Sequence, residues 1–241
     1  MAQLTPLARV CAYDRAGMGW SDAAPLPRDA GALTDDAVAL LTRAGIDGPL
    51  ILIGHSYGGA LVRRLAARLA ERVVGIVLVD ASDAAYTLSP AAQQAIAQNR
   101  THALRLGWAA RFGLLRVVVA LWPDRFDPLR GTPADLHAER LALYLRTARH
   151  FQEADDMAAQ QQLPPGPGGG GELNDIPVII ISRPPAMPMD EDETAWQQAQ
   201  RRLVETSSAR RHHVARQGGH IIQADDPETI VDAVRVLLER R

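Results

Sequence analysis

A serine between glycines lies at the point where a predicted strand passes into a predicted helix. Residues 54–59 read Gly-His-Ser-Tyr-Gly-Gly. They follow an apolar run at 50–53 and open a segment with apolar residues at helical spacing. A sharp turn here would lift the hydroxyl of Ser56 above the sheet. Ser56 is therefore the candidate nucleophile, and the backbone N–H of Tyr57 is the candidate donor to a developing oxyanion.

A serine nucleophile needs a base, and His220 has a suitable setting. It follows Gly218 and Gly219, after the last predicted strand and before the last predicted helix. Open α/β sheets present their reactive groups at the carboxyl ends of strands. His55 belongs to the turn that carries the serine, residues 54–59, which we call the elbow. We expect its side chain to be packed or to support the turn by hydrogen bonding. His220 is therefore the candidate general base.

Buried strands alternate with helices in most of the chain, and this alternation must position both residues. Uncharged runs at 49–53, 73–79 and 176–181 predict strands covered on both faces. Weaker strand candidates lie at 9–13 and 211–215, the second with the polar content of an edge strand. Helical patterns lie at 34–44 and 58–72, and a last helix opens at Asp226-Pro227. The fold class is α/β, with a mostly parallel sheet and flanking helices.

Residues 83–172 interrupt that alternation. They contain helical patterns at about 89–107, 108–121 and 133–162, and residues 164–171 are all Pro or Gly, as in a linker. We expect a discontinuous core formed by 1–82 and 173–241, with 83–172 as an inserted helical cap. Most of the aromatic residues lie in the insertion, which indicates a lid over an apolar pocket: Tyr86, Trp108, Phe112, Trp122, Phe126, Tyr144 and Phe151.

Composition excludes several kinds of chemistry. All 26 basic residues are arginine, which excludes a Schiff-base lysine and a Walker-type phosphate loop. A single cysteine, Cys11, excludes a disulfide framework, and a net charge of −2 gives no basic patch for nucleic acid. No run is long and apolar enough for a membrane span or a signal peptide. We expect a cytoplasmic protein with a small-molecule substrate, no cofactor, no metal, and no nucleic-acid or membrane partner; its oligomeric state is open.

Four segments in the same order resemble the α/β-hydrolase superfamily. They are residues 10–22 (VCAYDRAGMGWSD), the elbow at 54–59, the strand Val77-Leu78-Val79-Asp80, and Gly219-His220-Ile221-Ile222-Gln223. The resemblance implies a serine–acid–histidine triad that hydrolyses an ester, thioester, amide or similar bond through an acyl-enzyme. Because the nucleophile is a serine, the branches with an aspartate nucleophile are disfavoured.

The acid of the triad has more than one candidate. In most of the superfamily the acid follows the strand after the cap, here 176–181. The first carboxylates after that strand are Asp190, Glu191 and Asp192, and a stiff, proline-containing segment separates them from it. A minority place the acid one strand earlier, where Asp80 ends an uncharged strand. We favour Asp80 and keep Asp190, and then Glu191 or Asp192, as alternatives.

The resemblance implies eight strands, of which this sequence supplies the last five, and no His-Gly pair exists to give the usual second oxyanion donor. We therefore expect an N-terminally incomplete hydrolase fold, read from a longer gene. The leading function is a serine hydrolase acting on a small apolar substrate. The alternative is a truncated or non-catalytic chain that binds a ligand or partner, and a cofactor-free lyase or perhydrolase is a weaker third reading.

Overall fold

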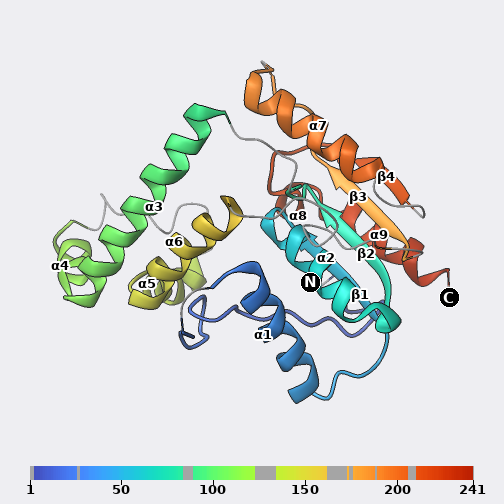
Figure 1. The fold of residues 1–241 in the computed structure, drawn as a ribbon. Helices are drawn as coiled ribbons and strands as arrows, with labels where there is room; N and C mark the ends of the chain where they lie inside the picture. Colours follow the sequence, from blue (N-terminus) through green and yellow to red (C-terminus); the bar gives the residue numbers. More distant parts are fainter. Residues whose placement is uncertain are drawn as a thin grey trace. The chain divides into compact units, whose positions relative to one another are not determined.

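The computed structural model describes residues 3–25, 28–83, 89–122, 134–161, 173, 176–187, 189–205 and 210–240. The chain forms two compact units, one of Met1–Cys11, Ala30–Ala92 and Gln162–Arg241, the other of Ala12–Asp29 and Gln93–Gln161. In chain order (Figure 1), the elements are α1 (Ala30–Arg43), β1 (Leu50–His55), α2 (Tyr57–Arg68), a 3-10 turn (Ala70–Arg72), β2 (Val73–Val79), α3 (Pro90–Arg111), α4 (Leu114–Leu121), a 3-10 turn (Ala134–Leu136), α5 (His137–Tyr144), α6 (Thr147–Gln161), β3 (Val178–Ser182), α7 (Glu191–Glu205), β4 (Arg210–Val214), α8 (Ile222–Asp225) and α9 (Pro227–Leu238).

The first unit is built on a parallel sheet with the strand order β1-β2-β3-β4. The register pairs His55 with Val79, and Val79 with Ile181. The carboxyl ends of β1, β2 and β3 therefore form one row. The residues that follow those ends lie along a single edge of the sheet, which is where reactive groups of such sheets are presented.

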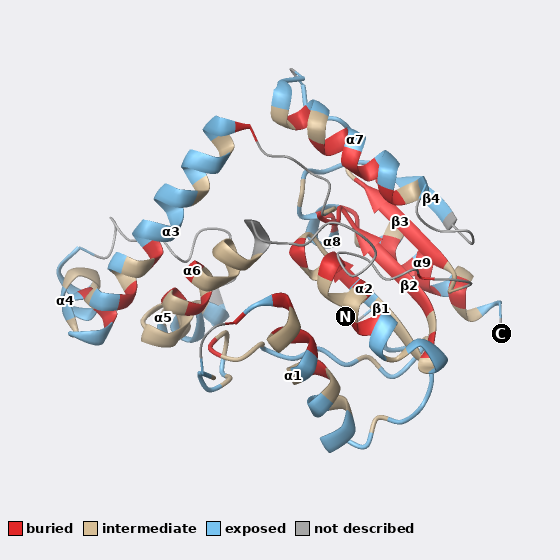
Figure 2. Ribbon diagram, in the orientation of Figure 1, coloured by how far each residue is buried: buried red, intermediate tan, exposed pale blue. Residues whose placement is uncertain are grey.

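Alternating side chains of β2 and β3 build a core on each face of this sheet. Val77, Val79, Ile179 and Ile181 pack with residues of α8 and α9. Ile76, Leu78, Val178 and Ile180 pack on the other face with residues of α2 and α7, such as Ala66 and Leu203. Figure 2 shows β2 and β3 as buried, which explains their uncharged sequences. Helices on both faces of a parallel sheet make an α/β fold, as predicted.

The strand prediction at 9–13 is wrong. The structure assigns no strand to these described residues, and four strands are found where the sequence indicated five. Val10 is only half-buried and its neighbours are exposed, so the segment has no buried face that would fix a strand. The predicted edge strand is confirmed as β4, at the end of the sheet.

In the second unit, the loop of residues 12–25 packs with helices α5 and α6. Arg15 forms an ion pair with Asp156 at 2.6 Å, and the indole N–H of Trp20 donates to Glu139 at 2.9 Å. The described part of the predicted insertion, 89–122 and 134–161, is helical apart from turns. The linker at 164–171, with Tyr86 and Phe126, lies outside the described residues. No helix in the part of the chain that the structure describes is both long and apolar enough to cross a bilayer.

Candidate active site

Ser56 occupies the single residue between β1 and α2. Its φ of 52° and ψ of −126° lie in a region that non-glycine residues rarely adopt, at a cost of about 1–3 kcal/mol. Two of its backbone hydrogen bonds join it to the end of β2 and the residues after it: the Ser56 N–H donates to the Val79 carbonyl at 3.1 Å, and the Ser82 N–H donates to the Ser56 carbonyl at 3.0 Å. Both partners flank Asp80. The strained turn therefore places the Ser56 backbone beside Asp80, the residue that follows β2.

Close backbone contact explains two of the elbow glycines. A Cβ on Gly54 would lie 2.4 Å from the Gly58 carbonyl oxygen, and one on Gly59 would lie 2.3 Å from the Ala81 Cβ. A Cβ on Gly58 would meet no atom within 4 Å. After Ser56, the steric requirement for glycine therefore falls on Gly59 and not on Gly58.

Tyr57 is the first residue of α2. Its backbone N–H therefore belongs to the positive end of the helix dipole, which favours negative charge nearby. This is the position that the sequence predicts for an oxyanion donor.

His220 and Asp80 meet, although 140 residues separate them. The Nδ1 of His220 lies 2.6 Å from Oδ2 of Asp80, and the Asp80 side chain is 0% exposed, against 41% for His220. Gly218, with φ +101°, and the hydrogen bond from the Gly219 N–H to Asp225 shape the loop that presents the histidine. A buried carboxylate that binds Nδ1 fixes the orientation of the imidazole ring. Nε2 is then the ring nitrogen that is available to accept a proton on the substrate side.

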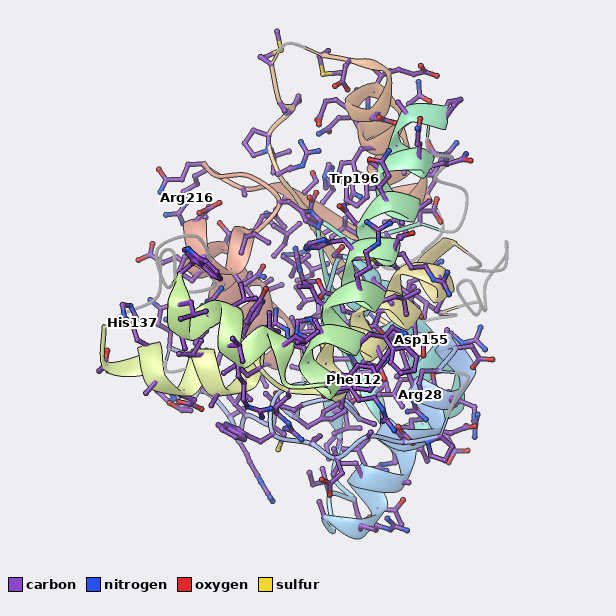
Figure 3. All side chains as sticks on the ribbon, turned by 90° about the vertical axis from the view of Figure 1, so that its left-hand side faces the viewer. Arg28, Phe112, His137, Asp155, Trp196 and Arg216 are labelled. Carbon is purple, nitrogen blue, oxygen red and sulfur yellow. The ribbon has the colours of Figure 1, made fainter. Side chains whose placement is uncertain are left out.

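Asp80 has two further neighbours that the sequence did not indicate. The indole Nε1–H of Trp196 donates to Oδ1 at 3.0 Å. The backbone N–H of Arg183 approaches the same oxygen at 3.3 Å, and its Nε lies 3.3 Å from Oδ2. The edge of the Trp196 ring also packs against His220, with centroids 5.4 Å apart; Trp196 is labelled in Figure 3.

His55, the neighbour of Ser56, packs against His220. The two ring centroids are 4.5 Å apart, and Nε2 of His55 lies 2.6 Å from the His220 carbonyl oxygen. Burial lowers the pKa of His55 below its ordinary 6.5, against the opposing effect of that hydrogen bond. A neutral His55 donating to this carbonyl supports the loop without adding charge, in the role expected for it.

The alternative acids have other partners. Asp190 precedes α7 and accepts a hydrogen bond from the Glu193 N–H at 2.7 Å, as a helix-capping residue does. Asp192 accepts hydrogen bonds from the backbone and hydroxyl of Ser89. Glu191, the first residue of α7, is exposed.

A second serine–histidine pair lies across β3 and β4. The Ser182 hydroxyl lies 2.7 Å from Nε2 of His212, but Ser182 is 2% exposed and offers no surface to a substrate. Within the described ranges, no group of three or more His, Cys, Asp or Glu side chains is arranged to hold a metal ion.

Known proteins resemble this chain in sequence and in fold. An uncharacterized protein of Schizosaccharomyces pombe is 28% identical over 228 residues, which cover 92% of this chain and 40% of that protein. Lipase LipV of Mycobacterium tuberculosis is 40% identical over 81 residues, 33% of this chain and 30% of the lipase. The chain thus spans less than half the length of these relatives.

The enol-lactonase of Burkholderia xenovorans shares the fold, with a TM-score of 0.64, 22% identity, and coverage of 99% of this chain and 84% of that one. The model of the alpha/beta hydrolase family matches residues 2–233. The chain belongs to the alpha/beta hydrolase family.

Proposed function

We propose that this chain is a serine hydrolase that cleaves an ester, thioester or similar bond of a small apolar substrate. The observation that carries the proposal is the 2.6 Å contact between His220 and the buried Asp80, at the sheet edge where Ser56 forms a strained elbow. A lipase and an enol-lactonase among the similar proteins support ester chemistry.

Acylation begins at Ser56. Nε2 of His220 takes the hydroxyl proton while Oγ bonds to the substrate carbonyl carbon, and the carbonyl electrons move to oxygen. The N–H of Tyr57 stabilises that oxyanion, and Asp80 stabilises the imidazolium. When the intermediate collapses, the bond to the leaving group breaks, and the leaving oxygen or sulfur takes the proton from His220.

Deacylation repeats these steps with water. His220 takes a proton from the water as it attacks the acyl carbon, and the collapse of the second intermediate returns that proton to Oγ of Ser56. The products are an acid and an alcohol or thiol.

The apolar character of the substrate rests on the helical unit. Its helices α3 and α4, with the residues next to them, bear large apolar side chains that are more than half exposed: Trp108, Phe112, Leu114, Val117, Leu121 and Trp122. Phe112 is labelled at the end of α3 in Figure 3. We propose, from this apolar composition, that the substrate carries an apolar acyl or alkyl group.

Labelling by a fluorophosphonate tests the nucleophile. An activated Ser56 should form a covalent adduct, and Ser56→Ala should abolish it. Ser182→Ala is the matched control because it removes the serine of the buried Ser182–His212 pair, and it should retain labelling. Adduct formation that persists in Ser56→Ala would refute the proposal, while an intact wild type that is never labelled would favour the alternative of a ligand- or partner-binding chain.

A further inference from the structure

A buried ion pair lies behind the acid of the proposed triad. Arg183, the residue after β3, forms a two-pronged pair with Glu193 of α7, with Nη1–Oε1 at 2.8 Å and Nη2–Oε2 at 2.5 Å. The side chains are 15% and 7% exposed. A bidentate pair of this kind fixes the guanidinium in one orientation.

The third nitrogen of that guanidinium faces Asp80. Arg183 Nε lies 3.3 Å from Asp80 Oδ2, the same oxygen that lies 2.6 Å from Nδ1 of His220. Arg183 and His220 therefore compete for one carboxylate oxygen. A cation so close to the carboxylate opposes the formation of a second positive charge on the imidazole.

Glu193 offsets that effect. Burial by itself would raise its pKa, but hydrogen bonds from Arg183, Gln197 and the Ala186 N–H outweigh burial and hold the pKa below the ordinary 4.5. Glu193 is thus charged at neutral pH. With Asp80 and Glu193 negative and Arg183 positive, the cluster keeps one net negative charge for a protonated His220.

Of the other groups near His220, two are uncharged, and a third, on the same loop, is a carboxylate. His55, at the end of β1, is kept neutral by burial, and Trp196 of α7 presents an uncharged ring. On the histidine's own loop, the Asp225 carboxylate accepts from the Gly219 N–H. The charged groups from the neighbouring strands and α7 are therefore Asp80, Arg183 and Glu193.

We propose that Arg183 and Glu193 are positioning residues that set the basicity of His220: Arg183 orients Asp80, and Glu193 cancels the charge of Arg183 so that Asp80 still stabilises the imidazolium. The inference rests on the proposed function for its catalytic meaning. The electrostatic effect itself is independent of catalysis, so it can be measured even in a chain that does not turn over substrate.

A histidine titration followed by NMR tests this inference. The ring resonance of His220, assigned by its loss in His220→Gln, is followed against pH in the wild type, Glu193→Gln, Arg183→Met and the double variant. Glu193→Gln should move the titration midpoint to lower pH by about half a unit or more. Arg183→Met should move it up, and the double variant should return it close to the wild type.

Two results would overturn the inference. One is a folded Glu193→Gln chain with the wild-type midpoint. The other applies if Glu193→Gln does not fold. In that case the double variant, which removes the paired charges together, is compared with Arg183→Met, and equal titration midpoints in these two variants would overturn the inference. If the wild type hydrolyses a p-nitrophenyl ester, the acid limb of kcat/KM should shift in parallel. A shifted titration without any hydrolysis would reject the proposed function and leave this inference standing.

Discussion

The carboxylate of Asp80 is contacted by several donor groups from distant parts of the chain. Nδ1 of His220 contacts one carboxylate oxygen, and the indole N–H of Trp196 donates to the other. Arg183 approaches both oxygens. A buried carboxylate that gains this many partners is fixed in orientation, and an imidazole bound to it is fixed as well. The orientation of the His220 ring thus depends on Trp196 and Arg183, which lie outside its own loop.

Replacing the acid tests this dependence. Asp80→Asn keeps the size of the side chain but removes its charge and favours the wrong tautomer of His220, so kcat for a short ester should fall on the order of 10⁴-fold. Asp190→Asn is the control: Asp190 caps α7, and because Asn caps a helix about as well as Asp does, the change should alter kcat less than about threefold and leave the stability nearly unchanged. The reverse ranking would move the acid to the later strand.

Ser56, Tyr57, His220 and Asp80 could be predicted as candidate site residues from the sequence. Each lies in a recognisable local pattern, next to glycines or at the end of a strand. Arg183 and Trp196 carry no such pattern. Their contacts with Asp80 span 103 and 116 residues, and they arise only when β3 pairs with β2 and α7 packs on the sheet. Periodicity describes one element at a time, so it cannot show such contacts.

The elbow depends on how tightly α2 approaches the end of β2. Gly59, in the first turn of α2, lies against Ala81 with no room for a side chain. Gly59→Ala should therefore force the helix away from the sheet edge and cost about 1–3 kcal/mol, as overpacking does. Gly58→Ala meets open space and should stay within about 1 kcal/mol of the wild type.

Urea denaturation of the two variants gives the comparison, and the labelling rate of Ser56 reports whether the turn is distorted. Equal stabilities, or a larger loss in Gly58→Ala, would show that the approach of α2 to β2 does not control the elbow. This pair of glycines could not be ranked from sequence, because the required distance is set by a strand 22 residues away in the chain, where Ala81 follows β2.

The sequence correctly predicts the strands with a strong pattern and one of the two with a weak pattern, β4, but the predicted strand at 9–13 is wrong. The uncharged runs of β2 and β3 are covered on both faces, so composition alone identified them. Residues 9–13 have strand-like residues but no buried face. Their state depends on neighbours, which a single sequence does not reveal.

For the molecule as a whole, histidines with lowered pKa values link folding to pH. Burial lowers the pKa of His55, His150 and His212 below the ordinary 6.5. The unfolded chain therefore binds protons near pH 6.5 while the folded chain resists them, so the free energy of unfolding should fall as the pH drops through that value. Glu193 and Asp226, with pKa values below their ordinary 4.5 and 3.8, add a second loss at lower pH, because folding then opposes their protonation.

Urea denaturation at pH 7.5, 6.5 and 5.5 measures the first of these effects. The wild type should be least stable at pH 5.5, and the decline should begin near 6.5 rather than near 4.5, because the histidines titrate before the carboxylates. His212→Gln removes one titrating ring while leaving an amide within reach of the Ser182 hydroxyl, 2.7 Å from Nε2 in the wild type. That variant should lose less stability than the wild type between pH 7.5 and 5.5. A stability that is flat or rising on acidification over this range would mean that these three histidine rings do not resist protonation in the folded chain.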